Sequence, residues 1–246
     1  MAKAQEAPRV SSQLRRDNIA VPKVIEEASG IHIFDRNIKS LLFSTDVATI
    51  CYTNADAILA VYPYTPHPAI IQAITNVSAS PVFAGVGGGL TSGQRSADIA
   101  LFAEASGVLG VVVNAPIALE TIHLIESTID SPIIQTVVSE YANIEDRLAA
   151  GVDILNVASG KQTKDVVAWI RQRYPNVPII ATGGRTEESI RGVIEAGANA
   201  VSWAPPTSAE LFNQKMSSYR EESRTRFINT HDGMTLNEYE KSQRRG

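Results

Sequence analysis

Residues 178–203 contain the pattern that most constrains what this chain can fold into. Pro178–Ala181 is a short apolar run, as expected for a parallel strand that is buried on both faces. Thr182–Gly184 interrupts this run, and Thr186 is suited to cap the helix that follows. Ala200–Trp203 is a second apolar run. The segment therefore predicts a strand, a glycine loop, an amphipathic helix and a second strand.

The same unit repeats through most of the chain. Eight alternating strands and helices with short connections favour a closed parallel barrel over an open sheet, so the sequence predicts an α/β protein built as a single (β/α)8 TIM barrel. Strands are expected at Ile38–Ser44, Ala57–Tyr62, Pro81–Val86, Val108–Val113, Pro132–Val138, Ile154–Val157, Pro178–Ala181 and Ala200–Trp203. Helices are expected at Val47–Thr53, His67–Val77, Gln94–Ala105, Ile117–Ile129, Ile144–Ala150, Asp165–Tyr174, Ser189–Ala196 and Ser208–Ser223.

Short extensions flank the predicted barrel, which takes residues 38–223. Residues 1–37 form an N-terminal extension, in which a short helix is expected at Val21–Ser29 and Ile31–Phe34 is expected as a short strand or as a plug beneath the barrel. Residues 224–246 form a C-terminal tail, in which a capping box predicts a small helix at Leu236–Gln243. This tail is apolar for a solvated segment. It is therefore expected to be an arm that packs on a second subunit of a homo-oligomer, with a mobile end as the alternative.

Composition argues against several classes of partner and location. The 246 residues carry a net charge of −4, which disfavours a nucleic-acid-binding surface. No apolar run is long enough to span a membrane. Cys51 is the single cysteine, so the chain cannot form an internal disulfide. These features are typical of a cytoplasmic protein.

Ionisable residues at the predicted strand ends are the candidates for catalysis, because TIM barrels carry their sites there. Asp46 and Glu140 are candidate acid and base groups. Asp46 is equally suited to cap the first helix, and a solvated position is the alternative for Glu140, which lies where the fifth strand opens. Lys161 is a candidate for Schiff-base formation or phosphate binding, although its place in a loop beyond the strand favours a solvated lysine.

Two glycine loops and one asparagine are the candidate ligand-binding residues. Gly87, Gly88 and Gly89 follow the third predicted strand, where three consecutive glycines suit a ligand contact, a lid or a plain loop. Asn114 ends the fourth strand. After the seventh strand, Thr182–Arg185 combines two glycines with an arginine just before a helix. Free N–H groups at a helix N-terminus favour an anion there, and a tight turn is the alternative. The candidate binding residues are Gly87, Gly88, Gly89, Asn114, Thr182, Gly183, Gly184 and Arg185.

Metal and cofactor signals are weak in this sequence. The four histidines are scattered, and no HxH or HxxxH pair occurs, so no metal site is predicted. A magnesium site at Asp46 and Glu140 is chemically allowed, but no motif signals it. No other cofactor is evident. The serine-hydrolase motif G-x-S-x-G is also absent.

The Gly183-Gly184 loop and its flanking strands resemble strands 7 and 8 of the phosphate-binding TIM barrels. That superfamily includes thiamine-phosphate synthase, keto-deoxy-phosphogluconate aldolase, flavin-dependent barrels and the glycerol-3-phosphate-responsive antiterminator. The resemblance implies that Gly183 and Gly184 bind a ligand phosphate. The chain departs from the family pattern at Arg185, which stands where those families have an apolar residue. It departs again at Ala204–Ser208, which lacks the glycine that ends strand 8 in those families.

Three functions follow as hypotheses. The first is an enzyme of lyase, aldolase or isomerase type acting on a small phosphorylated or anionic metabolite, with Asp46 or Glu140 moving protons. The second is a non-catalytic metabolite-sensing barrel that resembles the antiterminator. The third and weaker one is a flavin-dependent oxidoreductase, which would need the glycine that strand 8 lacks.

Overall fold

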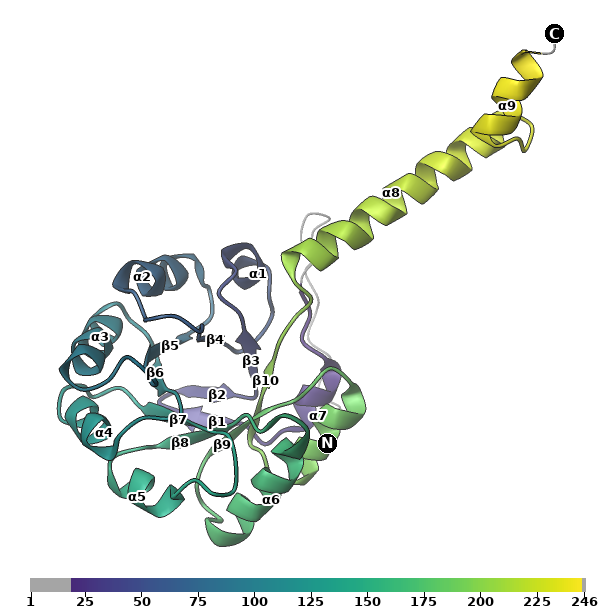
Figure 1. The fold of residues 1–246 in the computed structure, drawn as a ribbon. Helices are drawn as coiled ribbons and strands as arrows, with labels where there is room; N and C mark the ends of the chain where they lie inside the picture. The colour runs from purple at the N-terminus through teal and green to yellow at the C-terminus, as the bar shows by residue number, and fades with distance from the viewer. Residues whose placement is uncertain (1–18, 245–246) are drawn as a thin grey trace, which may run out of the picture. The chain divides into compact units, whose positions relative to one another are not determined.

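The computed structural model describes residues 19–244, so the first eighteen residues of the predicted N-terminal extension lie outside it. The chain forms two compact units, Met1–Pro205 and Pro206–Gly246. The first unit is a closed barrel of eight parallel strands in the order β10-β3-β4-β5-β6-β7-β8-β9, as predicted (Figure 1). The strands are β3 (Ser40–Phe43), β4 (Ala57–Ala60), β5 (Val82–Gly87), β6 (Gly110–Val113), β7 (Ile133–Val137), β8 (Ile154–Val157), β9 (Ile179–Thr182) and β10 (Ala200–Trp203).

Alternate residues of each barrel strand point to opposite faces, and both faces are buried. Leu59 and Phe83 pack in the interior cluster, whereas their neighbours Ile58 and Val82 pack in the cluster between strands and helices. Parallel strands covered on both faces favour apolar residues at nearly every position. This requirement explains why the sequence shows continuous apolar runs rather than alternation.

The helices of the first unit surround the barrel (Figure 1). The longer helices bury residues at helical spacing, as Ile71 and Ile74 do in the second helix. The helices are α1 (Val47–Cys51), α2 (Pro68–Val77), α3 (Gln94–Ala105), α4 (Leu119–Glu126), α5 (Ile144–Ala149), α6 (Thr163–Arg173) and α7 (Glu187–Glu195). These bounds confirm the predicted helices to within a few residues.

A β-hairpin precedes the barrel, and the sequence revealed only its first strand. Strands β1 (Ile31–Ile33) and β2 (Arg36–Ile38) pair antiparallel, so Ile38 ends the hairpin and does not begin a barrel strand as predicted. Ile31, Ile33 and Ile38 all belong to the interior cluster of the barrel. The Gly30 N–H donates to the Asn199 carbonyl just before β10. The hairpin therefore plugs the end of the barrel at which the strands begin.

The second unit consists of two helices, α8 (Ser208–Thr230) and α9 (Leu236–Gln243). Helix α9 has the predicted bounds, but α8 continues to Thr230, beyond the predicted end at Ser223. No residue of α8 is buried. Rings of Phe227, His231 and Tyr239 pack together, with Phe227 and His231 stacked at 3.9 Å between ring centres.

Within residues 19–244, no helix has both the length and the apolar character needed to cross a membrane.

Candidate functional site

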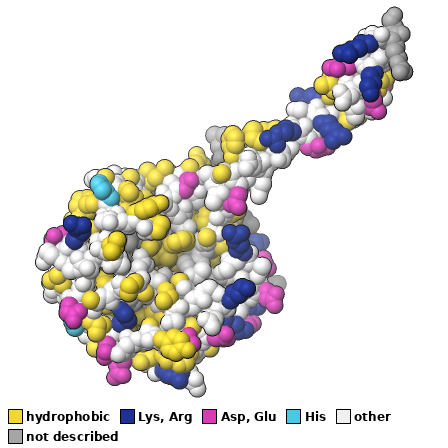
Figure 2. Space-filling view, viewed as in Figure 1, with side chains coloured by type: hydrophobic (Ala, Val, Ile, Leu, Met, Phe, Trp, Pro, Cys, Tyr) yellow, Lys and Arg dark blue, Asp and Glu magenta, His cyan; other side chains and the backbone are white. Residues whose placement is uncertain are grey.

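Two adjoining cavities lie at the end of the barrel where the strands finish. The inner one has a volume of about 300 Å³ and sits in the barrel mouth. The outer one, about 660 Å³, lies between the segment 61–66 that follows β4 and the glycine loop that ends β5. Val61 and Asn114 line both cavities. Figure 2 shows this face, in which hydrophobic and uncharged side chains surround a central hollow and charged side chains lie mostly around the edge.

Five polar side chains from five adjacent strands form one wall of the inner cavity. Thr136 Oγ1 donates to Asn114 Oδ1 at 3.0 Å, and Asn156 Nδ2 donates to Thr136 Oγ1 at 3.4 Å. Ser202 Oγ lies 3.5 Å from Thr182 Oγ1, to which it donates. The strand register explains why these groups meet, because Thr136 pairs with Asn156 and Thr182 pairs with Ser202. We call these residues the polar ring: Asn114, Thr136, Asn156, Thr182 and Ser202.

Asn156 is the polar-ring residue that has a buried polar atom without a hydrogen-bond partner among residues 19–244. The residue is 6% exposed, and its Oδ1 has no partner among the described residues. Buried polar atoms are nearly always hydrogen-bonded, so an unpaired amide oxygen that lines a cavity indicates a place for a ligand group. Ser159 Oγ, just beyond β8, is also buried, and it has no hydrogen-bond partner within the described part of the chain.

The opposite wall of the inner cavity is apolar. It consists of Phe43 at the end of β3, Leu59 in β4, and Val61 just beyond β4. Every described side chain that lines either cavity is uncharged at neutral pH. The lining thus combines amide and hydroxyl groups on one side with hydrocarbon on the other.

The triple-glycine loop shapes the outer cavity. Gly88 has a φ of 125°, and a side chain there would come within 2.7 Å of the Asn114 carbonyl oxygen. The N–H groups of Gly88 and Gly89 donate to the carbonyls of Thr91 and Pro116 at 2.8 and 3.0 Å. A side chain at Gly87 would overlap Ser96. All three glycines line the cavity, but two of their N–H groups are already engaged within the protein.

The Gly183-Gly184 loop also uses its glycines for packing. A Cβ at Gly183 would lie 2.6 Å from Val201 Cγ1 and 2.9 Å from Ile190 Cγ1. The Gly183 N–H donates to the Ser202 carbonyl at 3.0 Å, so it continues the barrel ladder. Gly184 has a φ of 75°, which favours glycine. Arg185 is exposed, and its side chain forms no hydrogen bond or ion pair within the part of the chain that the structure describes.

The candidate catalytic residues lie outside both cavities. Asp46 caps α1 by accepting a hydrogen bond from the Thr49 N–H at 2.9 Å, which is one of its two expected roles. Glu140 is half-buried beyond β7. Lys161 is exposed in the short 3-10 helix η3 (Gly160–Gln162). Of the predicted binding residues, Asn114 and Thr182 line the inner cavity.

The sequence reasoning missed three members of the polar ring: Thr136, Asn156 and Ser202. Each is a polar residue inside a mainly apolar strand, at the position whose side chain points inward. A polar residue within a strand that must be buried on both faces is the signal that marks them.

Metal ligands were also sought among the described residues. Within residues 19–244, no group of three or more His, Cys, Asp or Glu side chains is close enough to hold a metal ion. A magnesium site at Asp46 and Glu140 was chemically allowed by the sequence but not signalled by any motif, and it was not predicted.

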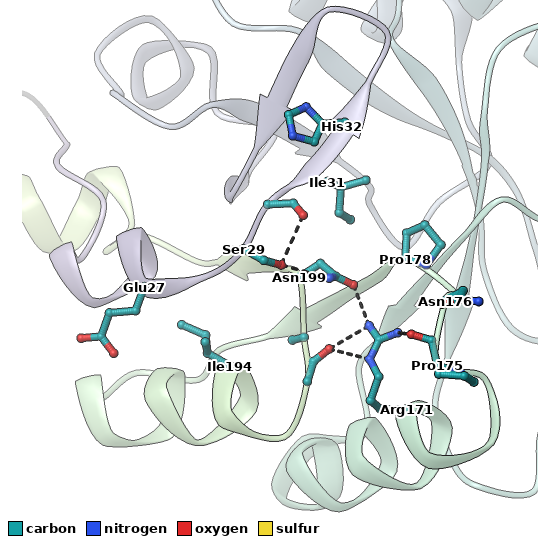
Figure 3. Close-up of a pocket in the computed structure, with 13 residues that line it drawn as sticks. Glu27, Ser29, Ile31, His32, Arg171, Pro175, Asn176, Pro178, Ile194 and Asn199 are labelled. Carbon is teal, nitrogen blue, oxygen red and sulfur yellow. Dashed lines mark hydrogen bonds between the residues drawn. The ribbon is translucent and has the colours of Figure 1, made fainter.

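A further cavity, of about 560 Å³, lies at the opposite end of the barrel (Figure 3). Arg171 lines this cavity, and all three nitrogens of its guanidinium group donate hydrogen bonds to protein oxygens. Nε and Nη2 bond to the Gly197 carbonyl, Nη2 also to Asn199 Oδ1, and Nη1 to the Pro175 and Val177 carbonyls, at 2.7–3.1 Å. Burial lowers the pKa of the Arg171 guanidinium. Because its donors are occupied by these loops, the arginine has a structural role.

Comparisons with known proteins agree with the fold. No family model matches the sequence. Inosine-5'-monophosphate dehydrogenase from Chlorobaculum tepidum is 36% identical over 64 residues, a match that covers 24% of this chain and 13% of that protein. Phosphoenolpyruvate phosphomutase from Streptomyces platensis subsp. rosaceus has a TM-score of 0.57 at 11% identity, covering 90% of this chain and 96% of that one. A phosphonopyruvate hydrolase, solved in complex with oxalate and Mg²⁺, has a TM-score of 0.54 at 14% identity, covering 84% and 90%. Structural likeness at these identities shows the TIM-barrel fold alone.

Proposed function

We propose that this barrel binds a small, oxygen-rich metabolite in its mouth. The observation that supports this most directly is the polar ring, which brings hydroxyl and amide groups from five adjacent strands to one wall of a cavity of about 300 Å³. That volume is at the lower end of the range for small-molecule sites, which join a mainly apolar lining to a few convergent polar groups. It also lies at the end of the barrel that carries function in this fold.

We further propose a reaction of lyase or isomerase type. The similar folds include proteins named as a phosphomutase and a phosphonopyruvate hydrolase. Reactions of this type develop negative charge on a substrate oxygen, and positioned amide and hydroxyl donors stabilise such charge. Glu140 is the candidate base, since Asp46 already caps α1. Lys161 is the candidate cation at the next strand end.

A metabolite-sensing barrel is the second candidate. It is favoured by the uncharged lining of both cavities, which offers binding groups without a carboxylate or a lysine among the described side chains. If a Glu140→Gln variant retains turnover, Glu140 is not the base. If the parent protein binds a metabolite but does not turn it over, the sensor is favoured.

An anionic group on the metabolite is proposed to bind at Arg185. Thermal unfolding of the protein with inorganic phosphate, glycerol 3-phosphate and ribose 5-phosphate tests this. A ligand at one hundred times its dissociation constant adds about 2.7 kcal/mol to the stability of the folded state. We expect at least one phosphate ester to raise the melting temperature, and Arg185→Ala to abolish that rise.

Arg36→Ala is the matched control, because Arg36 is exposed in the hairpin at the other end of the barrel. It should leave the rise unchanged. A rise that persists in Arg185→Ala, or the lack of any rise with the three phosphates, would rule out an anion at this loop.

The C-terminal unit is proposed to pair with a second copy of itself. Phe212, Met216 and Tyr219 follow one another at helical spacing, and Phe212 and Tyr219 are 64% and 51% exposed. Most of the stability of a helix in a protein comes from packing against other elements, and a helix with no buried residue lacks this packing. An antiparallel second copy centred near Tyr219 would cover this stripe. With the centre between Ser218 and Tyr219, Lys215 would lie opposite Glu222.

Light scattering after size exclusion tests this pairing. We expect a dimer for the full chain and a monomer for Tyr219→Glu, because the new carboxylate would be buried at the centre of the interface. Thr225→Glu, on the opposite side of α8, should remain dimeric. A monomeric parent protein at micromolar concentration would contradict the proposal.

A further inference from the structure

The inner cavity contains a hydrogen-bond acceptor that the described chain does not satisfy. Asn156 is held in place on one side, because its Nδ2 donates to Thr136 Oγ1, which donates in turn to Asn114 Oδ1. The other polar atom of this amide, Asn156 Oδ1, is buried and accepts no hydrogen bond from the described residues. An unsatisfied buried acceptor destabilises the folded protein. A ligand group that donates a hydrogen bond would relieve that cost.

The donor that suits this position is uncharged. The lining of the inner cavity is made of amide, hydroxyl, aromatic and aliphatic groups. An ammonium group in such a cavity would lose its hydration without gaining an opposite charge, which is strongly unfavourable. A hydroxyl group loses much less hydration free energy when it enters such a cavity. It can donate to Asn156 Oδ1 and accept from the Thr182 hydroxyl, because the hydroxyls of Thr136 and Ser202 already donate to Asn114 and Thr182.

The two walls of the cavity indicate the rest of the ligand. The polar ring lies on β6 to β10, and the apolar wall of Phe43, Leu59 and Val61 lies on and after β3 and β4. A ligand that fits both walls carries several hydroxyl groups along one edge and C–H groups on the other. Phe43 is 45% exposed at the mouth, where an aromatic ring can cover such a C–H face.

We infer that the inner cavity binds an uncharged polyhydroxylated moiety of the polyol or sugar class, with one hydroxyl donating to Asn156 Oδ1. This inference rests on the proposed binding function and specifies the part of the metabolite that enters the barrel. Any phosphate on the same metabolite stays outside the inner cavity, because no charged side chain described there would balance it.

Calorimetric titration of the full chain with xylitol, ribose and ribose 5-phosphate tests the inference. Asn156→Leu replaces the amide with an apolar side chain of similar size and removes the unpaired oxygen. We expect ribose or xylitol to bind the parent protein and to bind Asn156→Leu at least about tenfold more weakly. The melting temperature of unliganded Asn156→Leu should equal or exceed that of the parent. Asn176→Leu, exposed at the opposite end of the barrel, should bind as the parent does.

Asn156→Asp keeps an acceptor at the same position and should retain more binding than Asn156→Leu. The reverse order, or equal ribose binding by Asn156→Leu and the parent, would overturn the assigned hydrogen bond. Binding of ribose 5-phosphate alone, lost in Arg185→Ala and unchanged in Asn156→Leu, would overturn the sugar-class inference while leaving the proposed metabolite binding intact. If none of these three compounds binds and none of the phosphates tested above raises the melting temperature, the proposed metabolite binding would be wrong as well.

Discussion

Replacing Phe83 with alanine is expected to lower the free energy of unfolding by about 3–5 kcal/mol. Phe83 is fully buried in the barrel interior, where β5 pairs with β4 and β6. Its ring lies against Gly110, so close that a Cβ there would be 3.0 Å from Phe83 Cδ1. The glycine leaves the space that the ring fills. Removal of the ring would therefore leave a cavity that the rigid closed barrel cannot collapse to fill.

Urea denaturation followed by circular dichroism measures this loss. Phe34→Ala is the matched control, because Phe34 is 75% exposed in the turn of the hairpin, and it should change the stability by less than about 0.5 kcal/mol. A loss below about 1 kcal/mol for Phe83→Ala would show that the interior is not packed around this ring.

The barrel was predictable because the residues of both core clusters form recognisable apolar runs in the sequence. Strands β8 and β10 match their predicted bounds, since a strand buried on both faces leaves a continuous apolar run between turn residues. The hairpin strand β2 was missed because Ile38 looks like the first residue of the apolar run that follows it. Helix α8 was predicted too short because the segment Arg220–Arg226 has no large apolar residue, so the apolar spacing of Phe212, Met216 and Tyr219 does not continue through it.

The candidate site was less predictable for a geometric reason. Glycines stand out in a sequence, and the loops at Gly87 and Gly183 were chosen on that basis. Asn156 and Ser202 look like isolated polar residues in apolar strands, and they become neighbours of other polar groups only through the register of β7 with β8 and of β9 with β10. Register depends on barrel closure, which local sequence patterns do not specify.

Arg171→Met is expected to lower the free energy of unfolding by about 2–4 kcal/mol, since hydrogen bonds from a charged donor are among the stronger ones and several are lost together. The guanidinium joins the turn after α6, the start of β9 and the turn before β10 through the carbonyls of Val177 and Gly197 and through Asn199. Gly197 fits this arrangement, because a Cβ there would lie 2.8 Å from Arg171 Cγ. Asn199 in turn bonds to Ser29 Oγ, which links the N-terminal segment to the same point (Figure 3).

Thermal and urea unfolding of Arg171→Met and Arg173→Met separates this bonding from the loss of one positive charge. Arg173 lies on the same helix, but its guanidinium is exposed and stacks over Trp169 at 4.4 Å, so its replacement should cost less than about 1 kcal/mol. Arg171→Lys should recover only part of the loss, because three donors on one nitrogen cannot reach oxygens on all sides of a planar guanidinium. Equal effects at Arg171 and Arg173 would mean that net charge, and not the bonding at the base of the barrel, sets the stability of this end.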